Sequence, residues 1–203
     1  MSAVSAPATA RGDLISYSFG GTVDSVDPAL AGTFLVGQTL AGAYTFDSTT
    51  AATAGSNSTF AVFNALTHVN FTIGSYSASS SGAPEIQVDN NPPLPDDDRY
   101  ALVSRASQGL TGPSVGGLPL NFFSFPLDDS TDTVFSNALI LPTSLNLANF
   151  DKRQFFLFFG NIDTPSVVTG TITSLTAPEP SSLTLAGIGG LSGLGFWLRR
   201  RRA

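Results

Sequence analysis

One short motif in the sequence has the residue types of a serine hydrolase. Gly112-x-Ser114-x-Gly116 matches the nucleophile elbow, in which a serine lies on a sharp turn between a strand and a helix. No apolar strand pattern leads into the motif, and no helical pattern follows it. The single histidine, His68, precedes the serine, whereas the α/β-hydrolase order requires a histidine after it. We therefore interpret the motif as a Gly/Pro-rich loop and assign no catalytic residue.

Two groups of aspartates have the oxygen ligands that calcium prefers. Asp96, Asp97 and Asp98 lie in a proline-rich segment, and Asp128 and Asp132 follow an aromatic segment. The spacing does not match an EF-hand, because the loop after Asp128 lacks the glycine and the final glutamate of that motif. These residues are weak calcium candidates, and solvated carboxylates in turns are the alternative. One histidine and no cysteine are too few for a transition-metal site, and no cofactor is predicted.

The charge balance argues against nucleic acid as a partner. The chain has 203 residues and a formal net charge of -6, and four of its nine basic residues form the run 199–202. Residues 12–177 contain 14 acidic and 4 basic residues, which is the wrong sign for a phosphate-binding surface. The absence of cysteine excludes disulfides, iron–sulfur clusters and thiol nucleophiles.

The elements between these motifs show the pattern of β-strands. Hydrophobic residues alternate with polar ones in several short segments, which are separated by Gly, Pro, Ser and Asn. Residues 12–176 therefore predict an all-β domain, an antiparallel β-sandwich with a jelly roll as the alternative. The alternating segments are Ile15–Phe19, Leu40–Phe46, Val69–Ile73, Glu85–Asp89 and Val167–Leu175.

Two further segments, Asn121–Leu127 and Phe155–Phe159, are aromatic at odd and even positions alike. This pattern predicts central strands that are covered on both faces. A single helical turn is expected within Ser144–Phe150, and Ser77–Pro84 and Asn90–Asp98 are expected to be turns. The predicted core consists of Ile15, Phe19, Tyr44, Phe46, Phe71, Ile73, Phe156 and Phe158.

Residues 177–203 differ in composition from the rest of the chain. An uncharged apolar run, Leu183–Leu198, lies between Pro178-Glu179-Pro180 and the basic residues Arg199, Arg200, Arg201 and Arg202. A 16-residue helix spans about 24 Å, and arginine side chains together with local thinning of the bilayer can cover the rest. We expect a single transmembrane helix with its arginines in the cytoplasm and the β domain outside. A buried core helix is the alternative.

The order of these features resembles the PEP-CTERM sorting signal. The resemblance covers only the C-terminal residues, and it implies an exported bacterial protein whose tail is processed near Pro-Glu-Pro by an exosortase-type membrane enzyme. It also implies a species that makes an extracellular polysaccharide matrix, with Glu179 as the charged group that the enzyme recognises. The chain would then be an inner-membrane intermediate, held by its C-terminal helix, before it reaches the cell surface or the matrix.

Residues 1–11 have a weaker signature. Ala8-Thr9-Ala10 has the small-x-small form of a signal-peptidase site, but no apolar segment precedes it. We expect these residues to be the remnant of a signal peptide whose start lies upstream of Met1. A disordered leader is the alternative.

The sequence is compatible with two function classes. The first is a non-enzymatic surface or matrix protein that is exported through its tail. The second is a secreted carbohydrate-binding or hydrolytic protein, calcium-assisted in one form, in which Tyr76 or Tyr100 stacks on sugar. The only tryptophan, Trp197, lies in the tail, and tryptophan is the side chain best suited to such stacking. The first class is therefore favoured, with extracellular polysaccharide as a candidate partner.

Overall fold

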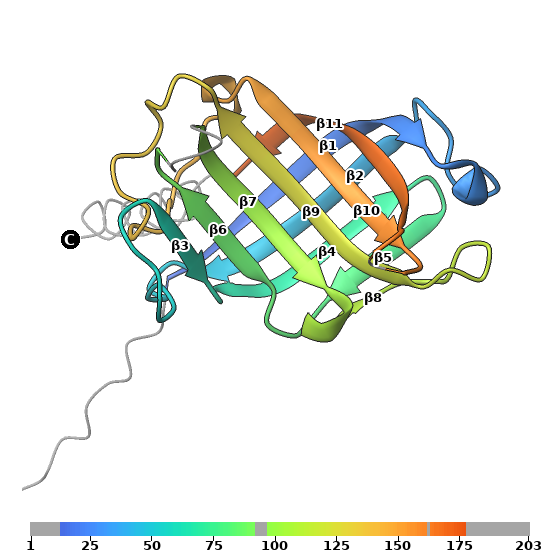
Figure 1. The fold of residues 1–203 in the computed structure, drawn as a ribbon, viewed down its shortest axis with the longest axis horizontal. Coiled ribbons are helices and arrows are strands. Elements are labelled where there is room, and N and C mark those ends of the chain that lie inside the picture. Colours follow the sequence, from blue (N-terminus) through green and yellow to red (C-terminus); the bar gives the residue numbers. More distant parts are fainter. Residues whose placement is uncertain (1–12, 92–96, 162, 178–203) are drawn as a thin grey trace, which may run out of the picture.

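Eleven antiparallel strands form one continuous sheet (Figure 1). The computed structural model describes residues 13–91, 97–161 and 163–177. The strand order in the sheet is β3-β6-β7-β9-β10-β11-β1-β2-β4-β5-β8. The strands are β1 Leu14–Val26, β2 Thr39–Asp47, β3 Phe60–Phe63, β4 Leu66–Ile73, β5 Tyr76–Ser80, β6 Glu85–Asp89, β7 Asp98–Arg105, β8 Leu110–Thr111, β9 Leu120–Asp129, β10 Lys152–Phe159 and β11 Ser166–Thr176.

Helical structure among the described residues is limited to three short 3-10 turns. They are η1 at Pro28–Leu30, η2 at Ala106–Gln108 and η3 at Leu147–Asn149. The last of these confirms the helical turn expected within Ser144–Phe150. At the first, the Asp27 side chain accepts a hydrogen bond from the Ala29 amide at 2.9 Å, which caps the turn. In the described part of the chain no helix has the length and apolarity needed to cross a membrane.

The sheet curls so that its two halves face each other across one aromatic core. The Phe71 ring of β4 lies 4.2 Å from the Phe123 ring of β9, and Phe19 of β1 lies 5.0 Å from Phe125. The Tyr100 hydroxyl of β7 also donates to the Tyr44 hydroxyl of β2 at 3.2 Å. These contacts between strands that are distant in the sheet place β6, β7, β9 and β10 over β1, β2 and β4.

The all-β antiparallel prediction is confirmed, but the two layers belong to one hydrogen-bonded sheet and not to two separate sheets of a sandwich. The connection runs through β10, β11 and β1. The β1–β11 pairing shifts register between Gly20 and Gly21 and again between Val23 and Ser25. Such bulges increase local twist and bend a sheet, which accounts physically for the curl at this point.

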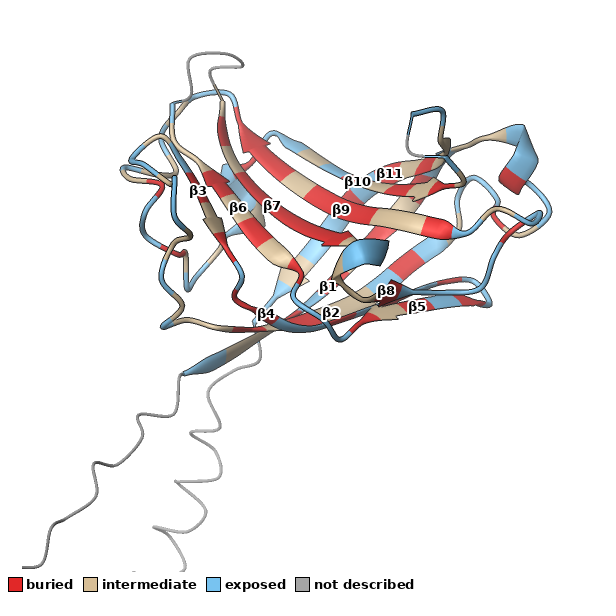
Figure 2. Ribbon diagram, turned by 60° about the horizontal axis from the view of Figure 1, so that its bottom comes forward, coloured by how far each residue is buried: buried red, intermediate tan, exposed pale blue. Residues whose placement is uncertain are grey.

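Alternating burial along the strands confirms most of the predicted core (Figure 2). Of the predicted residues, Phe19, Tyr44, Phe46, Phe71 and Ile73 are buried, and Ile15 packs against the core while partly exposed.

The assignment of Phe156 and Phe158 to the core is wrong. The neighbouring positions on β10, Phe155, Leu157 and Phe159, are fully buried, and the two predicted phenylalanines are only half-buried on the outer face. The segment is aromatic at both parities, so hydrophobicity alone could not determine which residues point inward.

Seven of the strands coincide with segments predicted from the sequence, whereas β3, β5, β7 and β8 were not predicted. The turn expected at Ser77–Pro84 is wrong, because its first four residues belong to β5. β5 consists largely of serine and alanine, which have low strand propensity, and its pairing with β4 forms it nonetheless. The leader at 1–11 and the predicted helix at 183–198 lie outside the described residues.

Candidate functional site

The Gly112-x-Ser114-x-Gly116 motif forms a loop between β8 and β9. Ser114 is exposed, and Val115 and Leu118 pair across a tight turn in which Gly116 and Gly117 have φ angles of 58° and 81°. These left-handed conformations favour glycine. β9 follows this loop and no helix does, so the context of a nucleophile elbow is absent here. The interpretation of the motif as a loop is confirmed.

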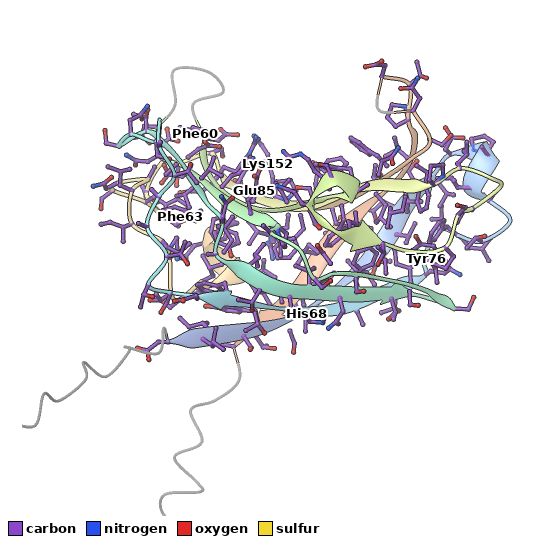
Figure 3. The ribbon with its side chains drawn as sticks, turned by 90° about the horizontal axis from the view of Figure 1, so that it is seen from below. Phe60, Phe63, His68, Tyr76, Glu85 and Lys152 are labelled. Carbon is purple, nitrogen blue, oxygen red and sulfur yellow. The ribbon has the colours of Figure 1, made fainter. Side chains whose placement is uncertain are left out.

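His68 is exposed on the outer face of β4, as its polar position in the strand predicted (Figure 3). Its Nε2 atom lies 3.0 Å from the Asn70 side-chain nitrogen. Within the described residues no hydrogen bond joins His68 to Ser114 or to an acidic side chain. The histidine therefore has the surroundings of a surface residue and not those of a catalytic base.

The calcium candidates converge at the end of the sheet where β7 begins and β9 ends. Asp98 is fully buried, and its carboxylate accepts hydrogen bonds from the backbone amides of Asn91 at 3.2 Å and Phe135 at 2.6 Å. Its own amide donates to the Asp132 side chain at 3.2 Å. Asp98 thus fixes two loops to the start of β7, because it replaces the backbone partners that these amides lack.

The other acidic side chains at this end of the sheet also form ion pairs or accept hydrogen bonds from loops. Asp128 is paired with Arg99, and Asp97 with Lys152. Burial raises the pKa of Asp129, but hydrogen bonds from the amides and hydroxyls of Thr131 and Thr133 outweigh it and lower that pKa to about 2.

These carboxylates accept hydrogen bonds from loop amides and form ion pairs with Arg99 and Lys152. Across residues 13–91, 97–161 and 163–177 no group of three or more His, Cys, Asp or Glu side chains is placed to hold a metal ion. Asp96 lies outside the described residues. The calcium assignment therefore gains no support from the geometry.

The two tyrosines considered for sugar stacking are both in the core. Tyr100 is fully buried against Tyr44, and Tyr76 packs against Phe34 and Phe159 with ring centroids 5.0 and 5.8 Å away. Burial raises the pKa of Tyr76 to about 12. Neither ring is accessible to a ligand, so this part of the sequence-based expectation is wrong.

An aromatic cluster on the outer surface was missed instead. Phe122 of β9 is the register partner of Arg105 on β7 and of Phe158 on β10, so the three side chains lie on one face of the sheet. The rings of Phe122 and Phe158 are stacked at 5.1 Å, and the Arg105 guanidinium lies 5.7 Å from the centre of the Phe122 ring. The sequence does contain a signal for this cluster, because Asn121–Leu127 and Phe155–Phe159 are aromatic at odd and even positions alike. From the sequence alone this pattern predicts burial on both faces, whereas one face is the outer surface.

The described chain ends directly after β11. Thr176, the last residue of that strand, is the register partner of Ser18 near the start of β1, so the chain leaves the sheet at the end where β1 begins. Pro178, Glu179, Pro180 and Arg199 to Arg202 lie outside the described residues, and the predicted sorting residues therefore have no geometry here.

Comparison with known proteins finds a match in this last part of the chain. The family model of the PEP-CTERM protein-sorting motif matches residues 176–202, which begin at the final residue of β11. No curated protein and no solved structure matches the chain. The motif implies export, processing by an exosortase and sorting to the cell surface. The chain is thus identified by its tail, as a protein that carries a PEP-CTERM sorting signal at residues 176–202.

Proposed function

We propose that the β domain is a non-enzymatic surface or matrix module, delivered by the sorting signal that follows it. The observation that carries the proposal is the position of the motif, which begins where the sheet ends. The domain is thereby separated from the processing segment by a single alanine, Ala177, before Pro178. Proline supplies no backbone N–H, so the sheet cannot readily extend into this segment, which stays accessible to the enzyme.

The chemistry of the domain supports a role without catalysis. Its buried carboxylates bind loop amides and neighbouring cations, and the one serine in a hydrolase-like motif lies in an exposed loop without an imidazole. A catalytic site would require a nucleophile and a base within hydrogen-bonding reach of each other. The domain thus has the character of a scaffold.

The proposal includes a membrane-bound intermediate. Leu183–Leu198 spans the inner membrane, Arg199 to Arg202 stay in the cytoplasm and Pro178-Glu179-Pro180 lies outside. Glu179 carries the charge that the exosortase recognises, and its cost in hydrocarbon keeps it at the outer boundary. Processing removes the helix and releases the domain to the surface.

The experiment is expression of the full chain in a host with an exosortase, followed by intact-mass analysis of the cell-surface fraction. The expected species lacks Trp197 and the arginines. Glu179→Ala should slow this processing, and Asp163→Ala, which removes an exposed acidic residue of the β domain, is the control that leaves it unchanged. A surface species that retains the whole tail would show that the tail is a permanent anchor and would overturn the proposal.

A further inference from the structure

The outer faces of β7, β9 and β10 form an open surface with an aromatic centre. In Figure 1 these strands face the viewer, and none of the described elements lies over them. Phe122 and Phe158 stack on each other, and Phe156 meets the Phe158 ring at 6.3 Å with an interplanar angle of 67°. All three rings are half-buried. They are held in place by one another and by the strands, so a ligand that covers them need not first order them.

A fixed polar network borders the rings on one side. The Glu85 carboxylate accepts hydrogen bonds from Arg105 Nη1 at 2.7 Å, from Gln108 Nε2 at 3.1 Å and from Gln87 Nε2 at 2.7 Å. Among the described residues, the hydrogen bonds of Arg105 all come from Nη1. The Nη2 and Nε groups of this guanidinium therefore remain available as donors, directly beside the Phe122 ring.

The charges on this surface occur as ion pairs, apart from the carboxylate of Asp89 at the end of β6. Arg105 is paired with Glu85, Arg99 with Asp128 and Lys152 with Asp97. A polyanion therefore finds no free cluster of cations here, and a polycation finds no free cluster of acids. A surface of aromatic rings with oriented hydrogen-bonding groups and no cluster of unpaired charges fits a ligand that has apolar C–H faces and many hydroxyl groups. Neutral sugars have this chemistry.

A second copy of the chain fits less well. Each phenylalanine side chain can bury roughly 200 Å², and with all three rings already half-buried the cluster offers about 300 Å² of further apolar area. A stable dimer buries about 1,200 Å² or more in total. The ion pairs around the cluster would also have to be desolvated in a dimer interface, whereas a bound oligosaccharide can leave them hydrated.

We propose that this surface is a binding site for a neutral polysaccharide, with the rings of Phe122 and Phe158 stacked on sugar faces and Arg105 and Gln87 bonded to sugar hydroxyls. The site lies where β7 and β10 end and β9 begins, which is the opposite end of the sheet from Thr176. It is therefore accessible while the sorting signal is engaged. The site deepens the proposed matrix role by naming a ligand class, but its test in solution does not depend on export.

The test is calorimetric titration of the full-length chain, purified in a detergent without a sugar headgroup, with cellohexaose, chitohexaose and maltohexaose. At least one of these neutral probes is expected to bind. Phe158→Ala should weaken that binding about tenfold or more. Phe158→Trp should strengthen it, because the larger ring extends the stacking surface, and a folding defect cannot produce this gain.

Phe60→Ala is the matched control, because Phe60 is an exposed phenylalanine at the edge strand β3, outside the cluster (Figure 3). It should leave the affinity unchanged. The proposal is overturned if none of the three probes binds, if Phe60→Ala weakens binding as much as Phe158→Ala, or if hyaluronan hexasaccharide binds as tightly as the best neutral probe. Correct sorting of a chain that fails this test would leave the surface role standing without its ligand.

Discussion

The two outer faces of the curled sheet differ in side-chain chemistry although both follow the same strand alternation. The aromatic face, formed by the outward residues of β6, β7, β9 and β10, carries phenylalanines and long charged side chains. The hydroxyl face is formed by the outward residues of β11, β1, β2, β4 and β5, and most of them are small. From Ser16 to Thr22, and at the positions of β2 and β11 paired with this stretch, none of the outward residues is charged. The outward residues of this face include Ser16, Ser18, Thr22, Thr39, Ala41, Ala43, Thr45, His68, Asn70, Thr72, Ser77, Ser79, Thr171, Thr173, Ser174 and Thr176. The exposed carboxylate of Asp24 lies just beyond Thr22 on β1 and accepts a hydrogen bond from the Thr171 hydroxyl.

The hydrogen bonds of the two faces differ in the same way. On the hydroxyl face they join close neighbours, such as Ser16 and Thr45 at 2.8 Å across β1 and β2. On the aromatic face, ion pairs tie β6 to β7 and β7 to β9 through long side chains. All four cations of the described residues, Arg99, Arg105, Lys152 and Arg153, come from β7 and β10. One face is therefore solvated by small groups, and the other has preorganised side chains that can meet a ligand.

The largest expected difference in the free energy of unfolding is between inward and outward substitutions on β10. Leu157→Ala should lower the free energy of unfolding by about 3 kcal/mol, because this side chain is fully buried and its removal leaves a cavity. Phe156→Ala should cost about 1 kcal/mol, because Phe156 is half-exposed on the outer face. Urea unfolding of the full chain, followed by far-UV circular dichroism, gives both values. Equal losses would show that the aromatic face is part of a core.

This contrast also shows what the sequence could predict. Where one parity is apolar and the other polar, as in β2 and β4, alternation identified the inward residues correctly. Where both parities are aromatic, as in β10, the inward set depends on which residues the partner strands β9 and β11 place opposite them. That register is a property of pairs of strands and is not contained in one segment. β7 was missed because its buried positions run consecutively and show no period.

The second prediction compares the loss of an ion pair on the aromatic face with the loss of a hydroxyl group on the hydroxyl face. Asp128→Ala should lower the free energy of unfolding by about 2 kcal/mol, because it leaves the partly buried Arg99 guanidinium without its carboxylate. Thr72→Ala, on the hydroxyl face, should change it by less than about 0.5 kcal/mol. The same urea titration measures both variants. A loss for Thr72→Ala as large as that for Asp128→Ala would remove the energetic difference between the faces.

The sorting signal could be predicted from the sequence, whereas the role of the aspartates where β7 begins and β9 ends could not. The order Pro-Glu-Pro, apolar run and arginines is contiguous, so the sequence contained the whole signal and the family comparison matched it. The two groups of aspartates at this end, residues 97–98 and 128–132, lie about thirty residues apart in the sequence, and their partners include backbone amides such as that of Phe135. The residue types alone suggested metal ligands at this end. Every residue except proline has a backbone amide, so the sequence does not show which amides the carboxylates will bind.

The smallest effect concerns Asp89, an aromatic-face residue with no ion-pair partner at salt-bridge distance among the described residues. Burial raises the pKa of its carboxyl and the Asp128 charge raises it further, which together exceed the lowering by Arg99. The folded state therefore keeps this proton to a higher pH than the unfolded chain, whose aspartates titrate near pH 4. As the pH rises from about 4 through the folded pKa, the folded state loses the proton at a cost, and stability falls.

Asp89→Asn removes this cost because the amide is neutral at every pH. The variant should be more stable than the parent chain at pH 7, by less than about 1 kcal/mol, and the gain should vanish below about pH 4. Asp129→Asn is the opposite-sign control, because the lowered pKa of Asp129 means that its charge stabilises the folded state above that range. Urea unfolding at pH 3.5 and pH 7 measures both differences. A destabilised Asp89→Asn at pH 7 would mean that attraction to Arg99 dominates, and the aromatic face would then hold its charges more tightly than its burial pattern implies.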